Sequence, residues 1–185
     1  MATKTSQRVF IWVIAIVLTI GTIGTYAALV LGAQNQNSQA VEQQQLIEQY
    51  KQQIYAANLP LDGYQAKPFN AKSVDSLETT DLKSGHGPVA KPSDKLTVSY
   101  FGWTPDGKIF DSSNKKDGSG QAFSFTPSQG GAIEGWVKGV PGMQVGGVRQ
   151  LTIPADLAYG SAGSPPLIPA STPLKFIVRL DKIGS

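Results

Sequence analysis

Few residues in this sequence of 185 could carry out covalent chemistry. There is no cysteine, so disulfides, thiolate nucleophiles and sulfur metal ligands are excluded together. The single histidine, His86, leaves one candidate base for a Ser-His-Asp triad and excludes a histidine-rich metal site. His86 is flanked by Ser84-Gly85 and Gly87-Pro88, a turn composition that favours a solvated loop residue. We therefore expect no metal or cofactor.

A large aromatic residue, Trp136, lies in a segment whose apolar residues recur at spacings of three and four. This spacing predicts a short helix over 133–140 with one buried face. Glycines at 131, 135 and 139 each cost a free helix about 1 kcal/mol relative to Ala. The helix can persist only if other elements pack closely onto it. Taken alone, Trp136 is simply a core residue on a packing helix.

Two polar residues, Asp111 and Tyr159, have a functional and a structural interpretation. Asp111 precedes Ser112 and Ser113, where a carboxylate commonly stabilises a turn. Tyr159 precedes Gly160, so its ring could lie on a surface turn. Only in combination with Trp136 and the motifs described below does a shared pocket become the better interpretation.

Segments with a period of two predict the strands that would hold these residues. They lie at about 76–83, 96–101, 108–111, 122–126, 149–153 and 174–180. Thr104-Pro105-Asp106-Gly107 has the composition of a hairpin turn between the second and third of them. Five or six antiparallel strands and one short helix predict an α+β domain over residues 75–185.

The N-terminal part has a different character. The 23 residues from Val9 to Leu31 carry no charge, which is long enough to cross a bilayer of roughly 30 Å. Residues 1–8 contain Lys4 and Arg8, and no Lys or Arg follows the apolar run until Lys51, so the positive-inside rule predicts a cytoplasmic N-terminus and an extracytoplasmic domain. A cleaved secretory signal is the alternative, but its apolar region is usually shorter.

Residues 32–74 are expected to connect the transmembrane helix, residues 9–31, to the domain. The Gln-rich stretch from Ser38 to Ala57 has helical spacing, with too few apolar heptads for a firm coiled coil, and predicts a helical stalk. Residues 65–73, with Pro68, predict an extended linker. The expected order is a cytoplasmic N-terminus, a transmembrane helix, a stalk with its linker, and the domain.

The charge of the chain argues against a nucleic-acid partner. The formal net charge is +3, and Lys4 and Arg8 precede the apolar run, so the folded part is close to neutral. Nucleic-acid binding would need Lys and Arg clustered on one face. We expect a lipid bilayer as the partner of residues 9–31.

Motifs spread over the predicted domain share one pattern. They are Val98 to Gly102, Asp106 to Ser113, Ile133 to Trp136, Leu151 to Pro154, Ala158 to Gly160, and Ile168-Pro169. In this order they resemble the FK506-binding-protein (FKBP) family of peptidyl-prolyl cis-trans isomerases, from about Ser76 to Ile183. The resemblance implies a curved antiparallel sheet wrapped around one short helix, with a pocket between the two.

The resemblance also implies roles for individual residues in that pocket. Trp136 would form the floor, and Asp111, the Tyr159 hydroxyl and the Ile133 backbone N–H would be the catalytic groups. The aromatic walls would be Tyr100, Phe110, Phe123 and Phe176, and the rim would be Leu167 and Ile168. Proline-containing polypeptides are the implied substrates, and macrolides such as FK506 and rapamycin are implied ligands.

We therefore expect a membrane-anchored prolyl isomerase that assists the folding of exported proteins at the outer face of the cytoplasmic membrane. Rotation about an X–Pro bond has a barrier near 18–20 kcal/mol but breaks no bond, which suits a sequence without cysteine. Two alternatives remain: a non-catalytic module or chaperone that binds proline segments, and a cell-surface tether.

Overall fold

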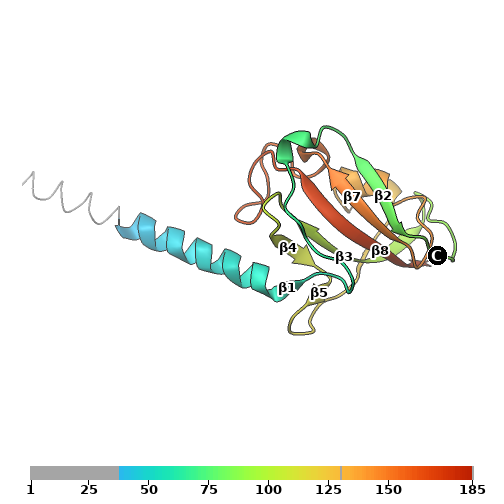
Figure 1. Ribbon diagram of the computed structural model, residues 1–185, viewed down its shortest axis with the longest axis horizontal. Coiled ribbons are helices and arrows are strands. Elements are labelled where there is room, and N and C mark those ends of the chain that lie inside the picture. Colours follow the sequence, from blue (N-terminus) through green and yellow to red (C-terminus); the bar gives the residue numbers. More distant parts are fainter. Residues whose placement is uncertain (1–37, 130, 185) are drawn as a thin grey trace, which may run out of the picture. The chain divides into compact units, whose positions relative to one another are not determined.

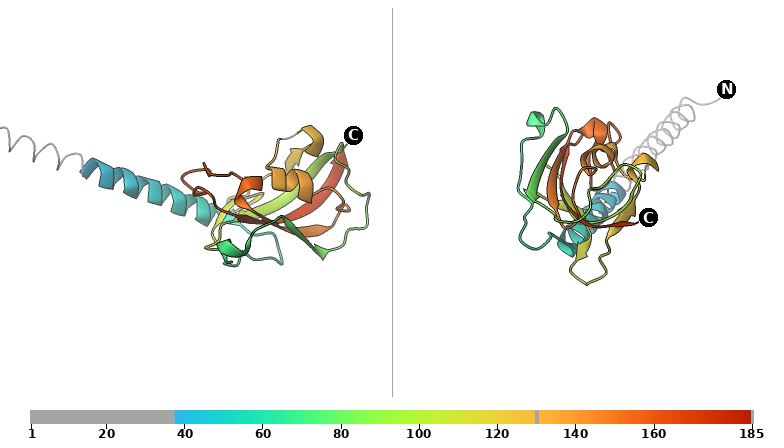
Figure 2. Two further views of the ribbon diagram at one scale, coloured as in Figure 1. Left: turned by 90° about the horizontal axis from the view of Figure 1, so that it is seen from above. Right: turned by 90° about the vertical axis from the view of Figure 1, so that its right-hand side faces the viewer.

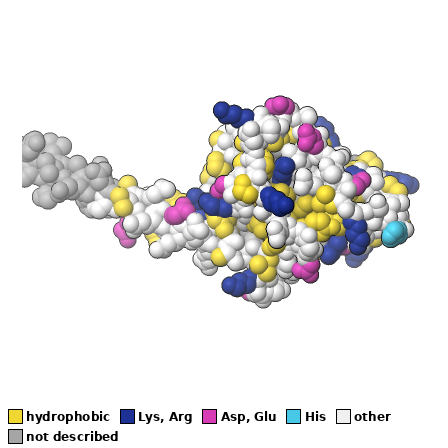
Figure 3. Space-filling view, viewed as in Figure 1, with side chains coloured by type: hydrophobic (Ala, Val, Ile, Leu, Met, Phe, Trp, Pro, Cys, Tyr) yellow, Lys and Arg dark blue, Asp and Glu magenta, His cyan; other side chains and the backbone are white. Residues whose placement is uncertain are grey.

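The computed structural model describes residues 38–129 and 131–184. The chain divides into two compact units, residues 1–48 and 49–185. Residues 38–57 are helical, as their spacing predicts, and apolar side chains are exposed along this helix (Figure 3). In the described ranges, no helix is both long and apolar enough to cross a membrane. The predicted span from Val9 to Leu31 lies outside the described residues.

The second unit is built on a six-stranded antiparallel sheet (Figure 1). Its strand order is β2-β7-β8-β3-β4, and β6 pairs with β3 beside this path. The strands are β2 (Glu78–Lys83), β3 (Lys95–Trp103), β4 (Ile109–Ser112), β6 (Phe123–Phe125), β7 (Val148–Ile153) and β8 (Leu174–Gly184). The predicted α+β class and the six strands are confirmed.

Shorter elements complete this unit. A two-stranded sheet pairs β1 (Asn58–Leu59) with β5 (Asn114–Lys115). The helix α2 spans Glu134–Gly139, and 3-10 turns lie at Ala71–Ser73, Pro127–Gln129 and Ala155–Leu157. The chain reverses between β3 and β4 at the predicted turn, where Gly107 has a φ of 82°. Residues with a Cβ rarely adopt a backbone φ in this range, which is why glycine occupies the position.

The helix α2 packs on one face of the curved sheet (Figure 2). Val98 and Tyr100 of β3 belong to this face and contact the same cluster as Trp136 and Val140. A Cβ on Gly135 would lie 2.5 Å from Cγ2 of Ile153, so glycine is what allows the helix to approach the strand this closely. Gly135 and Gly139, which weaken the isolated helix, thus permit its packing on β7.

The opposite face of the sheet is covered by the segment before the domain. Leu61 is 7% exposed and packs with Phe101 and Trp103 of β3 in a second apolar cluster. The indole N–H of Trp103 donates to the carbonyl oxygen of Lys67 at 2.9 Å, and the N–H of Phe69 donates to that of Pro105 at 3.0 Å. The segment predicted to be an extended linker is therefore packed onto the sheet and belongs to this unit.

Candidate functional site

A pocket of about 200 Å³ lies between α2 and the sheet. It brings together residues from β3, β4, β6, α2, β8 and the loop after β7. Eight of the ten site residues expected from the sequence line it: Tyr100, Phe110, Asp111, Phe123, Ile133, Trp136, Tyr159 and Phe176. Gly131 and Ala132 complete the lining. The fold thus assembles one largely aromatic concavity from segments up to 76 residues apart.

Trp136 is the centre of the aromatic packing. Its ring centroid lies 5.1 Å from that of Tyr100 and 5.3 Å from that of Phe176, both edge to face. Phe123 makes a third edge-to-face contact at 5.9 Å. Trp136 is only 4% exposed, and its indole N–H has no hydrogen-bond partner in the part of the chain that the structure describes. These contacts hold the rings in fixed orientations.

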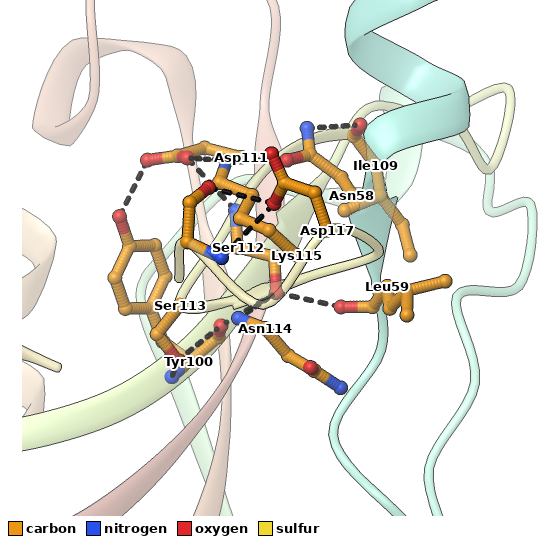
Figure 4. Close-up of polar contacts among 11 residues, drawn as sticks. Asn58, Leu59, Tyr100, Ile109, Asp111, Ser112, Ser113, Asn114, Lys115 and Asp117 are labelled. Carbon is orange, nitrogen blue, oxygen red and sulfur yellow. Dashed lines mark hydrogen bonds and ion pairs between the residues drawn. The ribbon is translucent and has the colours of Figure 1, made fainter. Parts of the chain in front are cut away.

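The polar wall of the pocket is organised around the Asp111 carboxylate (Figure 4). Oδ2 of Asp111 accepts a short hydrogen bond from the Tyr100 hydroxyl. Oδ1 accepts from the backbone N–H of Ser112 at 2.8 Å and from Nζ of Lys115 at 3.0 Å. Both carboxylate oxygens therefore have partners, which fixes the orientation of the group.

Two tyrosine hydroxyls near this carboxylate resist ionisation. Burial, the hydrogen bond to Asp111 and its negative charge raise the pKa of Tyr100 well above its usual range. Burial and the same charge also raise the pKa of Tyr159, whose side chain remains partly open to solvent. Both hydroxyls therefore stay protonated at neutral pH and can donate hydrogen bonds. Tyr159 is 39% exposed, so its hydroxyl is accessible to a ligand in the pocket.

A backbone donor lies at the start of α2. Ile133 is the N-cap residue, with φ −62° and ψ 151°, and its carbonyl oxygen accepts from the N–H of Trp136 at 2.9 Å. The first N–H groups of a helix have no acceptor within the helix. Ile133 also lines the pocket beside Trp136, and a role for its backbone N–H as a donor there remains a prediction.

The structure places the two predicted rim residues outside this pocket's lining. Leu167 lines a separate cavity of about 290 Å³, where its carbonyl oxygen lies 3.5 Å from the Tyr55 hydroxyl. Ile168 is 3% exposed and belongs to the core cluster around α2. A rim role for either residue remains a prediction.

Two contributors to the site were missed from the sequence. Gly102 of β3 lies beneath the aromatic walls, since a Cβ there would be 2.6 Å from Cδ1 of Phe176 and 2.7 Å from Cζ of Phe110. Lys115 forms the ion pair with Asp111. The opposite charges of Asp111 and Lys115, four residues apart, could have suggested this ion pair. However, a continuous strand through both residues would separate them by about 13 Å, too far for the pair to form.

The comparisons with known proteins identify a family, and the match to its model lies within the second unit. The family model described as "FKBP-type peptidyl-prolyl cis-trans isomerase" matches residues 87–181. FK506-binding protein 4 of Neurospora crassa is 48% identical over 112 residues, which cover 60% of this chain and 23% of the relative. The protein of that name from Rhizopus delemar is 43% identical over 109 residues, 59% of this chain and 28% of the relative. The chain thus spans about a quarter of the length of these relatives.

Two solved structures share the fold more completely. A peptidyl-prolyl cis-trans isomerase from Pseudomonas syringae pv. tomato is 28% identical, with a TM-score of 0.51 over 74% of this chain and 92% of the other. The structure of AtFKBP13 is 33% identical, with a TM-score of 0.53 over 58% of this chain and 93% of the other. Both likenesses span nearly the whole of the compared structure.

Proposed function

Because the chain belongs to the family of FKBP-type peptidyl-prolyl cis-trans isomerases, we propose that it catalyses rotation about X–Pro bonds in polypeptides. The relatives named FK506-binding protein 4 also support a macrolide of the FK506 type as a ligand of the same pocket. The observation that carries the proposal is the aromatic pocket over Trp136, which has one oriented carboxylate at its wall.

The pocket suits a reaction in which a planar amide becomes twisted. Amide resonance places negative charge on the carbonyl oxygen, and water stabilises this planar form more than the twisted one. An aromatic pocket that removes water from the proline and its preceding carbonyl therefore lowers the cost of twisting. Phe110, Phe176 and Trp136 are the buried aromatic residues of the lining that would do this.

The polar groups would act on the carbonyl of the residue before proline. The Tyr159 hydroxyl and the Ile133 N–H can donate to its oxygen and hold it while the proline ring rotates. The twisted amide loses electron donation from nitrogen, so its carbonyl carbon becomes more electron-poor. The Asp111 carboxylate is suited to stabilise that carbon. Contacts that are stronger in the twisted state accelerate the reaction, by about tenfold for each 1.36 kcal/mol.

A non-catalytic binding module is the second candidate. The same aromatic surface could hold proline-containing segments, in the manner of a chaperone, without turnover. The oriented carboxylate favours catalysis, because an apolar cleft that only binds proline has no need of a charge held by three partners.

Exchange spectroscopy on a short X–Pro peptide separates these two functions. A substoichiometric amount of the full chain should speed exchange between the cis and trans proline signals far beyond the spontaneous rate. Uncatalysed isomerisation takes about 10–100 s. Peptide signals that shift on titration while cis/trans exchange keeps its spontaneous rate would establish the binding module instead.

We place the isomerase domain outside the cytoplasmic membrane, where it would act on exported chains. The support is the uncharged run from Val9 to Leu31, with Lys4 and Arg8 before it and no Lys or Arg after it until Lys51. Protease added to intact spheroplasts should release a fragment containing the domain, and alkaline extraction should leave the chain in the membrane. Protection from protease, or release of the intact chain by alkali, would contradict this placement.

A further inference from the structure

We propose that Asn58, in the segment before the domain, is a positioning residue of the active site. It holds Nζ of Lys115 in the place where this amine pairs with the Asp111 carboxylate. The inference rests on the proposed isomerase function, because the geometry of Asp111 matters only if the pocket is active.

Asn58 is a buried polar residue whose side chain is paired at both ends. It is 4% exposed, and its Nδ2 donates to the carbonyl oxygen of Ile109 at 3.0 Å. Its Oδ1 accepts a short hydrogen bond from Nζ of Lys115, at 2.5 Å. The bond to Ile109, in the strand that carries Asp111, fixes the amide so that its oxygen faces the lysine (Figure 4).

Lys115 connects this amide to the pocket. Its Nζ lies 3.0 Å from Oδ1 of Asp111, and the lysine side chain is 27% exposed. A lysine with one exposed partner would lose rotamer freedom for little gain, and such pairs are worth little. The second, buried acceptor on Asn58 changes this, because the ammonium group is held between an amide oxygen and a carboxylate oxygen. Asp111 is thereby left with Oδ2 directed to the Tyr100 hydroxyl.

The backbone around Asn58 is tied to the strands of the site at several points. The Ser112 hydroxyl donates to the carbonyl oxygen of Leu59 at 2.6 Å, and the N–H of Lys116 donates to that of Ala57 at 2.9 Å. Nδ2 of Asn114 donates to the carbonyl oxygen of Pro60 at 2.9 Å. Asn58 is therefore held by a short sheet, β1 with β5, rather than by its own side chain alone.

A double-mutant cycle on the full chain tests the inference. Asn58→Ala and Lys115→Met should each lower kcat/KM by about three- to tenfold, the effect of one charge-assisted hydrogen bond partly open to water. The double variant should be no slower than Lys115→Met alone, because Asn58 acts through the lysine. The inference would be overturned if the double variant lost kcat/KM by the product of the two single losses. A folded Asn58→Ala variant with wild-type kcat/KM would overturn it as well.

Two further variants separate positioning from stability. Asn114→Ala removes the bond to Pro60, which anchors the same segment, without touching Lys115, so its kcat/KM should match wild type. Asn58→Asp keeps an oxygen acceptor for the lysine but loses the donor that binds the Ile109 carbonyl oxygen, so its kcat/KM should lie between those of wild type and Asn58→Ala. If Asn58→Ala does not fold, Lys115→Met must still lower kcat/KM, since otherwise the lysine has no role to be positioned for.

A measurement without turnover distinguishes failure of this inference from failure of the isomerase proposal. The side-chain ammonium signal of Lys115 in a nitrogen-correlated NMR spectrum can be assigned with Lys115→Met. In wild type this ammonium group should be protected from hydrogen exchange with water. The signal should be lost in a variant whose residue 58 no longer accepts a hydrogen bond from the group. We expect retention in Asn58→Asp and loss in Asn58→Ala. An inactive wild type with this pattern would reject the isomerase function alone, whereas an unchanged signal in Asn58→Ala would reject the role of Asn58.

Discussion

The Tyr100 hydroxyl donates a short hydrogen bond to Oδ2 of Asp111, across the neighbouring strands β3 and β4. The same tyrosine ring contacts Trp136 edge to face at 5.1 Å. One residue therefore joins the aromatic floor to the polar wall of the pocket. The orientation of the carboxylate and the position of the floor depend on the same side chain.

This relationship predicts a loss of stability at alkaline pH. Because the folded-state pKa of Tyr100 is raised above the unfolded value near 10, the unfolded chain releases this proton first as pH rises. The stabilisation is complete below about pH 10 and is lost above it, by at most about 1.4 kcal/mol per pH unit. Urea unfolding at pH 8 and pH 11 should show a steeper decline for wild type than for Tyr100→Phe. Equal declines would contradict the assignment.

Gly102→Ala should damage the pocket without adding any group to it. The new Cβ would lie within 2.7 Å of both Phe176 and Phe110, so these rings must move. We expect kcat/KM to fall by about tenfold or more, since displacement of a positioning surface by about 1 Å can cost more than that. The matched control is Gly184→Ala in β8, whose Cβ would meet nothing closer than 3.6 Å. Equal activities of the two variants would show that Gly102 does not shape the site.

Leu61→Ala should destabilise the second unit although Leu61 precedes the predicted domain. The side chain is 7% exposed among Phe101, Trp103 and Ile177, and a buried Leu→Ala change costs about 2–5 kcal/mol. Leu59→Ala is the control, because Leu59 is 36% exposed and its replacement should lower the free energy of unfolding far less. The free energy of unfolding from urea titration measures both. A small effect at Leu61 would mean that this segment is not part of the cooperative unit.

The sequence was informative where a pattern repeats along the chain. Alternating apolar residues predicted strands such as β8, and the spacing around Trp136 predicted α2, because each element must bury one face. The site roles of Asp111 and Tyr159 came from the family resemblance, since either residue alone is equally consistent with a turn.

Pairings between distant segments could not be read from any local pattern. Asn58 and Lys115 lie 57 residues apart, and only the fold brings them together. The segment containing Leu61 and Phe69 has no helical or strand period, so it resembled a linker although its apolar side chains are packed on the sheet. Leu167 lines a second cavity together with Tyr55, a residue 112 positions away that no local pattern connects with it, and its rim role remains a prediction.

The most direct test of the account is kcat/KM for cis-to-trans isomerisation of an X–Pro peptide by the full chain, compared between Asp111→Ala and Asp117→Ala. Both changes remove one carboxylate, but Asp117 lies in an exposed turn, where its Oδ1 accepts hydrogen bonds from the backbone N–H and the hydroxyl of Ser119. We predict that wild type and Asp117→Ala accelerate the reaction equally, and that Asp111→Ala, once shown to be folded, is at least about tenfold slower, a loss of about 1.4 kcal/mol of transition-state stabilisation. Equal rates for the two variants would contradict the central role of the Asp111 carboxylate.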